Sequence, residues 1–136
     1  MDFMRSIFIA ATGLRAQSSR MRVISENIAN ANSTAQTPNG DPYRRRVPTF
    51  NTSFDRELQA TVVSMGNVRA DQSAFTVRNE PGHPAADASG NVKYPNVNTM
   101  IETVDMREAQ RSYEANLNVI SATRRMIQRT IEILRT

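Results

Sequence analysis

The residue types that could catalyse a reaction or bind a metal are few in this sequence and lie apart from one another. There is no cysteine, and the one histidine, His83, lies between prolines in Pro-Gly-His-Pro. A hydrolytic triad or an imidazole metal centre would depend on His83 alone, whereas such centres need several suitable side chains together. We therefore expect no metal, no cofactor and no enzymatic activity.

Carboxylates offer little more. Asp105 and Glu108 lie near each other on an expected helix, but Arg107 and Arg111 lie among them, so ion pairing along the helix surface explains them. Residues 87–91, Asp-Ala-Ser-Gly-Asn, resemble a fragment of a calcium loop. They lack its spaced acidic ligands and closing glutamate, which favours a simple turn.

The third chemical candidate is the run of three arginines, Arg44–Arg46, because guanidinium groups bind phosphate. The net charge is +4, and sixteen arginines but one lysine supply the positive charge. Nucleic-acid surfaces usually add further basic or stacking side chains, and here Tyr43 is the only such neighbour. In an extended segment Arg45 points away from Arg44 and Arg46. We expect pairing with acidic groups of a neighbouring subunit, or solvation; a basic coiled-coil adaptor for DNA or an anionic membrane is the alternative.

The positions of the prolines divide the chain into three parts, which must position the residues discussed above. All six lie between residues 38 and 95, and long helices exclude proline. The division predicts a coiled-coil helix over 1–31, a loop-rich lobe with short strands over 32–99 and a second coiled-coil helix over 100–136.

The first flank carries a seven-residue repeat. Positions that alternate by four and three residues are apolar with one exception, Gln17, over four heptads: Phe3, Ile7, Ala10, Leu14, Gln17, Met21, Ile24, Ile28 and Ala31. This pattern is typical of a coiled-coil seam and predicts a helix over residues 3–31.

The second flank repeats the pattern and predicts a helix over residues 100–134. Its seam positions are Met106, Gln110, Tyr113, Leu117, Ile120, Arg124, Ile127, Ile131 and Leu134. A neighbouring row of Val119, Met126 and Ile133 widens the apolar face, which suits contact with more than one neighbour. The fold class is therefore mainly α: two long terminal helices in an antiparallel coiled-coil stalk. A single globular bundle is the alternative, but residues 32–99 offer no further helix to complete one.

The middle of the chain predicts a small irregular or β-hairpin lobe. Residues 58–71 and 73–79 are rich in strand-forming side chains, and Met65-Gly66-Asn67 is a plausible turn between strands. Residues 79–96 are polar and rich in glycine and proline, which indicates exposed loop.

The N-terminal apolar stretch, Ile7–Ala11, is too short for a secretory signal, and no segment is long enough to span a membrane. We expect a soluble chain that keeps its start and does not insert into a membrane.

The first helix ends in a distinctive motif. Residues Asn27-Ile28-Ala29-Asn30-Ala31 are followed by Thr37, Pro38 and Gly40 and then by Tyr43 and Arg44. This motif resembles that of the axial flagellar proteins, the rod and hook subunits of bacterial flagella. The family's usual compact Thr-Pro-Gly-Tyr is expanded here over residues 34–46. This expanded loop, together with residues 81–98 and 104–126, resembles most the C-type proximal rod subunits, with the B-type as the closest alternative.

The resemblance implies a structural subunit that assembles helically into the hollow drive shaft between the membrane ring and the hook. It implies export through the flagellar type III apparatus without a cleaved signal peptide, and a periplasmic location in the basal-body rod. The implied partners are copies of the chain, other rod proteins, proteins at the junction with the membrane ring and, during secretion, the export apparatus. No nucleic acid and no cofactor are implied.

The helix seams and the motif together predict the subunit interface. Asn27 and Asn30 fall in the last turns of the first helix, where we expect their amides to bond carbonyls of a neighbouring chain. The predicted interface residues are Ile7, Leu14, Met21, Ile24, Asn27, Ile28, Asn30, Tyr43, Arg44, Tyr113, Leu117, Ile120, Ile127, Ile131 and Leu134.

Overall fold

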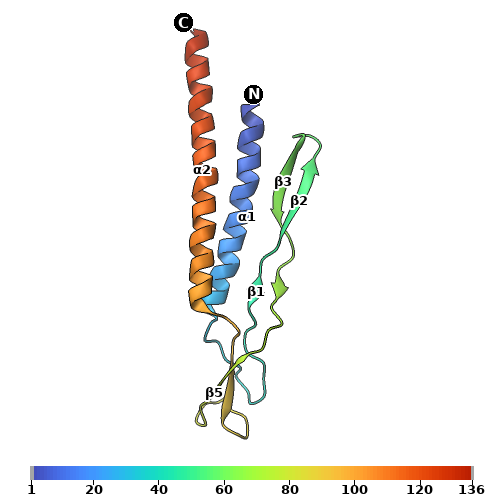
Figure 1. The fold of residues 1–136 in the computed structure, drawn as a ribbon, viewed down its shortest axis with the longest axis vertical. Coiled ribbons are helices and arrows are strands. Elements are labelled where there is room, and N and C mark those ends of the chain that lie inside the picture. The colour runs from blue at the N-terminus through green and yellow to red at the C-terminus, as the bar shows by residue number, and fades with distance from the viewer. Residues whose placement is uncertain (1, 136) are drawn as a thin grey trace. The chain divides into compact units, whose positions relative to one another are not determined.

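The structure, a computed structural model, describes residues 2–135 and contains a long helix near each end of the chain. Helix α1 spans Phe3–Ala29 and helix α2 spans Thr99–Arg135 (Figure 1). Both helices were predicted, and their bounds lie within two residues of the expected ones. Asn98 is the N-cap of α2: its Oδ1 accepts hydrogen bonds from the backbone N–H groups of Met100 and Ile101 at 3.0 and 3.4 Å.

Three two-stranded antiparallel ribbons form the middle of the chain. Strand β1 (Arg46–Val47) pairs with β4 (Arg69–Ala70), β2 (Phe50–Asp55) with β3 (Ala60–Met65), and β5 (Thr76–Asn79) with β6 (Asn91–Tyr94). The predicted strand regions contain β3, β4 and β5. The sequence did not predict β1, β2 or β6.

Two expectations about this region were wrong. The chain reverses at residues 56–59, where Asp55 Oδ1 accepts from the N–H of Glu57, and not at 65–67, where Gly66 N–H bonds the carbonyl of Thr49. The stretch 79–96 is not uniformly exposed loop, since it contains β6 and the fully buried Val92.

The chain divides into two compact units, and both helices contribute to each. The first comprises the described parts of Met1–Met21, Thr49–Asn67 and Arg107–Thr136, and the second comprises Arg22–Pro48 and Val68–Met106. The division into three ranges along the sequence stays a prediction.

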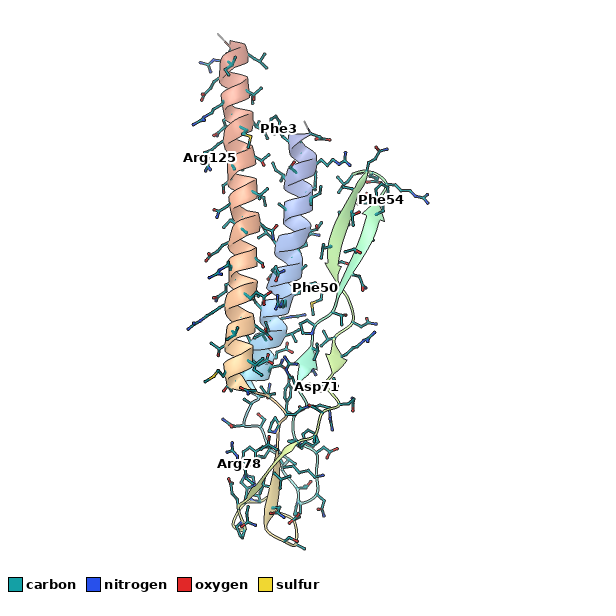
Figure 2. The ribbon with its side chains drawn as sticks, viewed as in Figure 1. Phe3, Phe50, Phe54, Asp71, Arg78 and Arg125 are labelled. Carbon is teal, nitrogen blue, oxygen red and sulfur yellow. The ribbon has the colours of Figure 1, made fainter. Side chains whose placement is uncertain are left out.

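In the first unit, α1 and α2 run in opposite directions. Gly13 lies against the side chain of Asn116, and Arg20 pairs with Glu108 at 3.4 Å, so later positions on α1 meet earlier ones on α2. Strand β3 lies on another side of α1, where it and residues 12–19 line a cavity of about 290 Å³. Phe50 and Phe54 on β2 are 41% and 63% exposed (Figure 2).

The buried row of α2 differs from the predicted seam. Ala109 and Thr123 are buried and Asn116 is half-buried, whereas Gln110, Leu117, Arg124 and Ile131 are exposed. Small side chains therefore occupy the covered face, which allows a close helix approach. Coiled-coil packing along the whole seam stays a prediction.

The second unit has a small apolar core. Its buried apolar residues are Val23, Ile24, Ala31, Ala85 and Val92. None of the helices in residues 2–135 is long and apolar enough to cross a membrane.

Candidate functional site: a buried polar junction

A fully bonded polar side chain of the second unit is Asn27, in the last turn of α1. It is completely buried, and its amide makes four hydrogen bonds. Nδ2 donates to the carbonyl of Arg46 at 2.8 Å and to Glu102 Oε2 at 3.0 Å. Oδ1 accepts from the Tyr43 hydroxyl and from the Arg46 N–H, both at 2.9 Å. Asn27 therefore joins the end of α1, the segment before β1 and the start of α2.

Asn27 belongs to a polar junction that is formed with Tyr43, Arg45, Asp71, Asn96 and Glu102. Its buried charge is Glu102, in the first turn of α2, which is 1% exposed. Its Oε1 accepts a hydrogen bond from Arg45 Nε, so each of its oxygens has a partner. Arg45 also lies 3.6 Å from Asp71 and 3.7 Å from Asp105. A buried carboxylate is tolerated only with such pairing.

Neighbouring acidic groups keep Arg45 charged, and burial keeps Tyr43 protonated. Burial opposes the charge of Arg45, but the hydrogen bond and charge of Glu102, with Asp71 and Asp105, raise the pKa of its guanidinium. Burial is the main cause that raises the pKa of the Tyr43 hydroxyl above 10.0, opposed by Arg46 and assisted by Glu26. Arg45 therefore stays charged, and Tyr43 keeps the proton that it donates to Asn27.

Asn96 links Arg45 to Asp71 within the junction. Its Oδ1 accepts from the Arg45 N–H at 2.8 Å, and its Nδ2 donates to the carbonyl of Asp71 at 3.0 Å. Asp71 in turn accepts from the Ser73 N–H, and this hydrogen bond is the first cause that lowers the pKa of the Asp71 carboxyl below 3.8.

The other two arginines of the run bind elsewhere. Arg44 Nη1 donates to the carbonyls of Asp71 and Ser73, and its guanidinium stacks 4.1 Å from the centre of the Phe75 ring. Arg46 pairs with Glu26 at 3.3 Å on the surface. The three side chains thus do not form one basic patch. Arg45 and Arg46 pair with acidic groups of their own chain, and the expected pairing of the run with a neighbouring subunit stays a prediction.

The structure also shows the hydrogen-bond partners of the two amides in the helix-end motif. Both polar atoms of Asn27 are used within the chain, and Asn30 Nδ2 donates to the carbonyl of Glu26 in its own helix at 2.8 Å. The amide of Asn27 therefore completes the fold, where we had expected bonds to carbonyls of a neighbouring chain. For Asn30, which is half-buried and donates one hydrogen bond, that expectation stays a prediction. The predicted place of both residues at a subunit interface stays a prediction.

The other predicted interface residues differ in exposure. Ile24 is buried, and Leu117, Ile131 and Leu134 are exposed. The half-buried ones are Ile7, Leu14, Met21, Ile28, Tyr43, Arg44, Tyr113, Ile120 and Ile127.

Sequence reasoning missed Arg45, Glu102 and Asn96 as members of one site. The alternation of the arginine run indicated that Arg45 points away from its neighbours. Glu102 lies seven residues before the buried Ala109, so a shifted heptad would have placed it on the covered face of α2.

The junction is suited to a mechanical role. Its polar atoms are saturated by one another, and within residues 2–135 there is no cluster of three or more side chains that could hold a metal ion. Saturated buried networks specify one arrangement of the elements that they join, since any other leaves charges unpaired.

Two protein families match parts of the chain that contain Asn27 and Glu102. Residues 7–35 match the family described as flagella basal body rod protein, and residues 88–133 match the C-terminal family of the flagellar basal body rod FlgEFG proteins.

Whole-length relatives carry the same description. The chain is 50% identical over 127 residues to the flagellar basal-body rod protein FlgC of Agrobacterium fabrum, covering 93% of this chain and 91% of that protein. It is 38% identical over 152 residues to FlgC of Borreliella burgdorferi (98% and 99% covered) and 37% identical over 125 residues to FlgC of Salmonella typhimurium (92% of each).

Proposed function

This chain belongs to the family of flagellar basal-body rod proteins and is a structural subunit of that rod, not an enzyme, and we propose that an exposed apolar face of α2 joins it to its neighbours there. In this proposal subunits assemble helically into the proximal rod, the hollow shaft that transmits torque from the membrane ring toward the hook. The terminal helices form an antiparallel coiled-coil layer in the shaft.

The observation that carries the proposal is the exposure of large apolar side chains along α2. Leu117 is 46% exposed, Met126 48%, Ile131 58% and Leu134 81%. These positions belong to the two rows that the sequence predicted as a wide apolar face. Leu117 and Met126 are nine residues apart and so lie on opposite sides of the helix, and Ile131 and Leu134 lie in its last turns. Soluble monomers rarely expose so many large apolar side chains along one element, which leaves them for contact with other molecules.

The proposed occupants are copies of this chain and other rod proteins, with proteins of the membrane-ring junction at one end of the rod. A head-to-tail contact that does not close on itself produces a helical array. We further propose that the chain reaches the periplasmic rod through the flagellar type III export apparatus without losing an N-terminal segment.

The alternative, an adaptor for DNA or an anionic membrane, finds no support in the arginine run. Arg44 is bound to backbone carbonyls and to Phe75, and Arg45 to Glu102, so only Arg46 of the three is largely exposed, at 54%.

The test replaces the apolar face without touching the junction. The double variant Ile131→Asp with Leu134→Asp, expressed in a strain that lacks the gene, should abolish swimming and leave basal bodies without complete rods. Gln128→Asp, on an exposed polar position of the same helix, is the matched control and should swim. Normal swimming and intact rods in the double variant would contradict the assembly role of this face. Circular dichroism of both purified variants checks that α2 is retained.

A further inference from the structure

The loop between α1 and β1 contains the one asparagine of twelve that precedes a glycine, Asn39 before Gly40. We propose that Asn39–Gly40 is a site of spontaneous covalent modification, at which Asn39 loses its side-chain amide and becomes aspartate or isoaspartate. The proposal is independent of rod assembly.

The local backbone is a tight turn. Gly40 N–H donates to the carbonyl of Thr37 at 3.1 Å, and Asn39 has φ of 62°. Proline at the second position and a positive φ at the third define a type II turn, in which glycine is favoured at the third position and asparagine is tolerated. Asn39 therefore occupies a backbone conformation that most side chains avoid.

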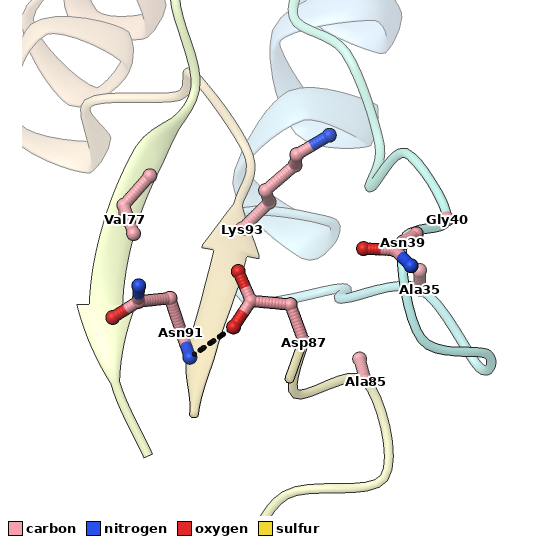
Figure 3. A pocket seen from close by; sticks show the side chains of 8 residues that line it. All are labelled: Ala35, Asn39, Gly40, Val77, Ala85, Asp87, Asn91 and Lys93. Atoms are coloured by element: carbon pink, nitrogen blue, oxygen red, sulfur yellow. Dashed lines mark hydrogen bonds between the residues drawn. The ribbon is translucent and has the colours of Figure 1, made fainter. Parts of the chain in front are cut away.

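The Asn39 side chain is accessible and is not held. It is exposed, and no hydrogen bond of its amide is present within residues 2–135. Figure 3 shows it pointing into a surface pocket of about 230 Å³, whose lining includes Asp87 and Lys93. Asn27, by contrast, is buried with four hydrogen bonds to its amide. The Asn39 amide can thus rotate toward the backbone and meet water.

The reaction needs only water. The Gly40 backbone nitrogen gives its proton to solvent base and attacks Asn39 Cγ. The new C–N bond closes a five-membered succinimide, and the side-chain nitrogen leaves with a proton as ammonia. Water then opens the ring at either carbonyl, which gives aspartate or isoaspartate. Gly40 permits the attack because it carries no side chain beside the attacking nitrogen.

The turn itself controls the rate. The attacking nitrogen of Gly40 donates the hydrogen bond to Thr37, so this bond must open before the ring can close. The folded chain should therefore react more slowly than the same residues in a short peptide. Isoaspartate adds a methylene to the main chain of the turn, only a few residues before Tyr43 of the junction.

The experiment incubates the purified full-length chain at neutral and mildly alkaline pH and follows its proteolytic peptides by mass spectrometry. The peptide with Asn39 should gain the mass of the exchange of NH₂ for OH and split into two isomers. Its conversion should be at least an order of magnitude faster than that of any other asparagine, and it should rise with pH. Exposed Asn32, which precedes a serine, is the internal comparison.

The matched variant is Asn39→Gly, because glycine keeps the positive φ while removing the amide. Its peptide should show no mass gain. Gly40→Ala is unsuitable, since its Cβ would lie 2.8 Å from that of Ala35. The proposal is overturned if Asn39 converts no faster than Asn32, or if a product appears that lacks the isoaspartate isomer expected from the succinimide.

Discussion

Asn27 and Glu102 lie 75 residues apart in the sequence, are 0% and 1% exposed, and share a hydrogen bond of 3.0 Å between Nδ2 and Oε2. This bond links the last turn of α1 to the first turn of α2. It is one of four at Asn27, and it leaves one oxygen of Glu102 for Arg45. The position at which the helix hairpin closes is therefore specified by polar contacts, in a chain whose helix pattern is otherwise apolar.

Replacing Asn27 with alanine should strongly destabilise the chain. The change leaves the Tyr43 hydroxyl, both backbone groups of Arg46 and one oxygen of Glu102 short of a partner. Since a buried polar group without a partner costs about 1–3 kcal/mol, we expect the free energy of unfolding to fall by at least about 3 kcal/mol. Urea unfolding followed by circular dichroism measures it, with exposed Asn32→Ala as control. A loss below about 1 kcal/mol would show that the junction is not a principal source of stability.

Tyr43→Phe should have a smaller effect, because Asn27 Oδ1 keeps the Arg46 N–H as donor. We expect a loss of about 1 kcal/mol at neutral pH. The folded-state pKa of Tyr43 lies above 10.0, so its contribution to stability is present below pH 10 and is lost as pH rises through the folded-state pKa. Unfolding curves at alkaline pH should therefore decline less steeply for the phenylalanine variant. An unchanged alkaline slope would contradict this account.

The contribution of Asp71 to stability should depend on pH in the opposite way to that of Tyr43, because acid removes it. The hydrogen bond from Ser73 and the charge of Arg45 lower the pKa of its carboxyl below 3.8. The stability that this carboxylate adds is present above its unfolded pKa and is lost as pH falls through the folded-state value. Asp71→Asn should therefore flatten the decline in stability below about pH 4. Glu57→Gln, which removes an exposed carboxylate, controls for the change in net charge; an equal flattening there would argue against a specific role for Asp71.

The sequence was sufficient for the elements that follow from periodicity. The heptad rows of residues 3–31 and 106–134 and the absence of proline outside 38–95 predicted both helices closely. It was insufficient where pairing joins distant residues. Strand β2 is exposed along most of its length, and the alternation of Phe50, Thr52 and Phe54 with polar residues is too short to have predicted it, so its register with β3 identifies it. The partners of Arg45 lie 26–60 residues away in the chain, and an arginine has no local pattern that selects Glu102 over solvent.

Gln17 breaks the apolar seam of α1, and its Oε1 is buried without a hydrogen-bond partner among residues 2–135. Gln17→Met has a similar shape and removes the unpaired acceptor. We expect it to raise the free energy of unfolding by about 1 kcal/mol. Thermal unfolding by circular dichroism measures the change, and Gln110→Met, at an exposed position of α2, is the control. A destabilised Gln17→Met variant would mean that the acceptor is bonded in solution, by water for example.

Gly13 of α1 lies in close contact with Asn116 of α2 in the first unit. A Cβ at Gly13 would lie 2.9 Å from Asn116 Nδ2, which itself donates to the carbonyl of Ser112 at 3.0 Å. Gly13→Ala alone should therefore lower the unfolding free energy, because Asn116 must move and lose that bond. Alanine is otherwise worth about 1 kcal/mol more than glycine within a helix. With Asn116→Ala already present, the same change should become stabilising, since the obstruction is gone. A double-mutant cycle in urea tests this reversal of sign, and additive effects of the two substitutions would exclude the close contact.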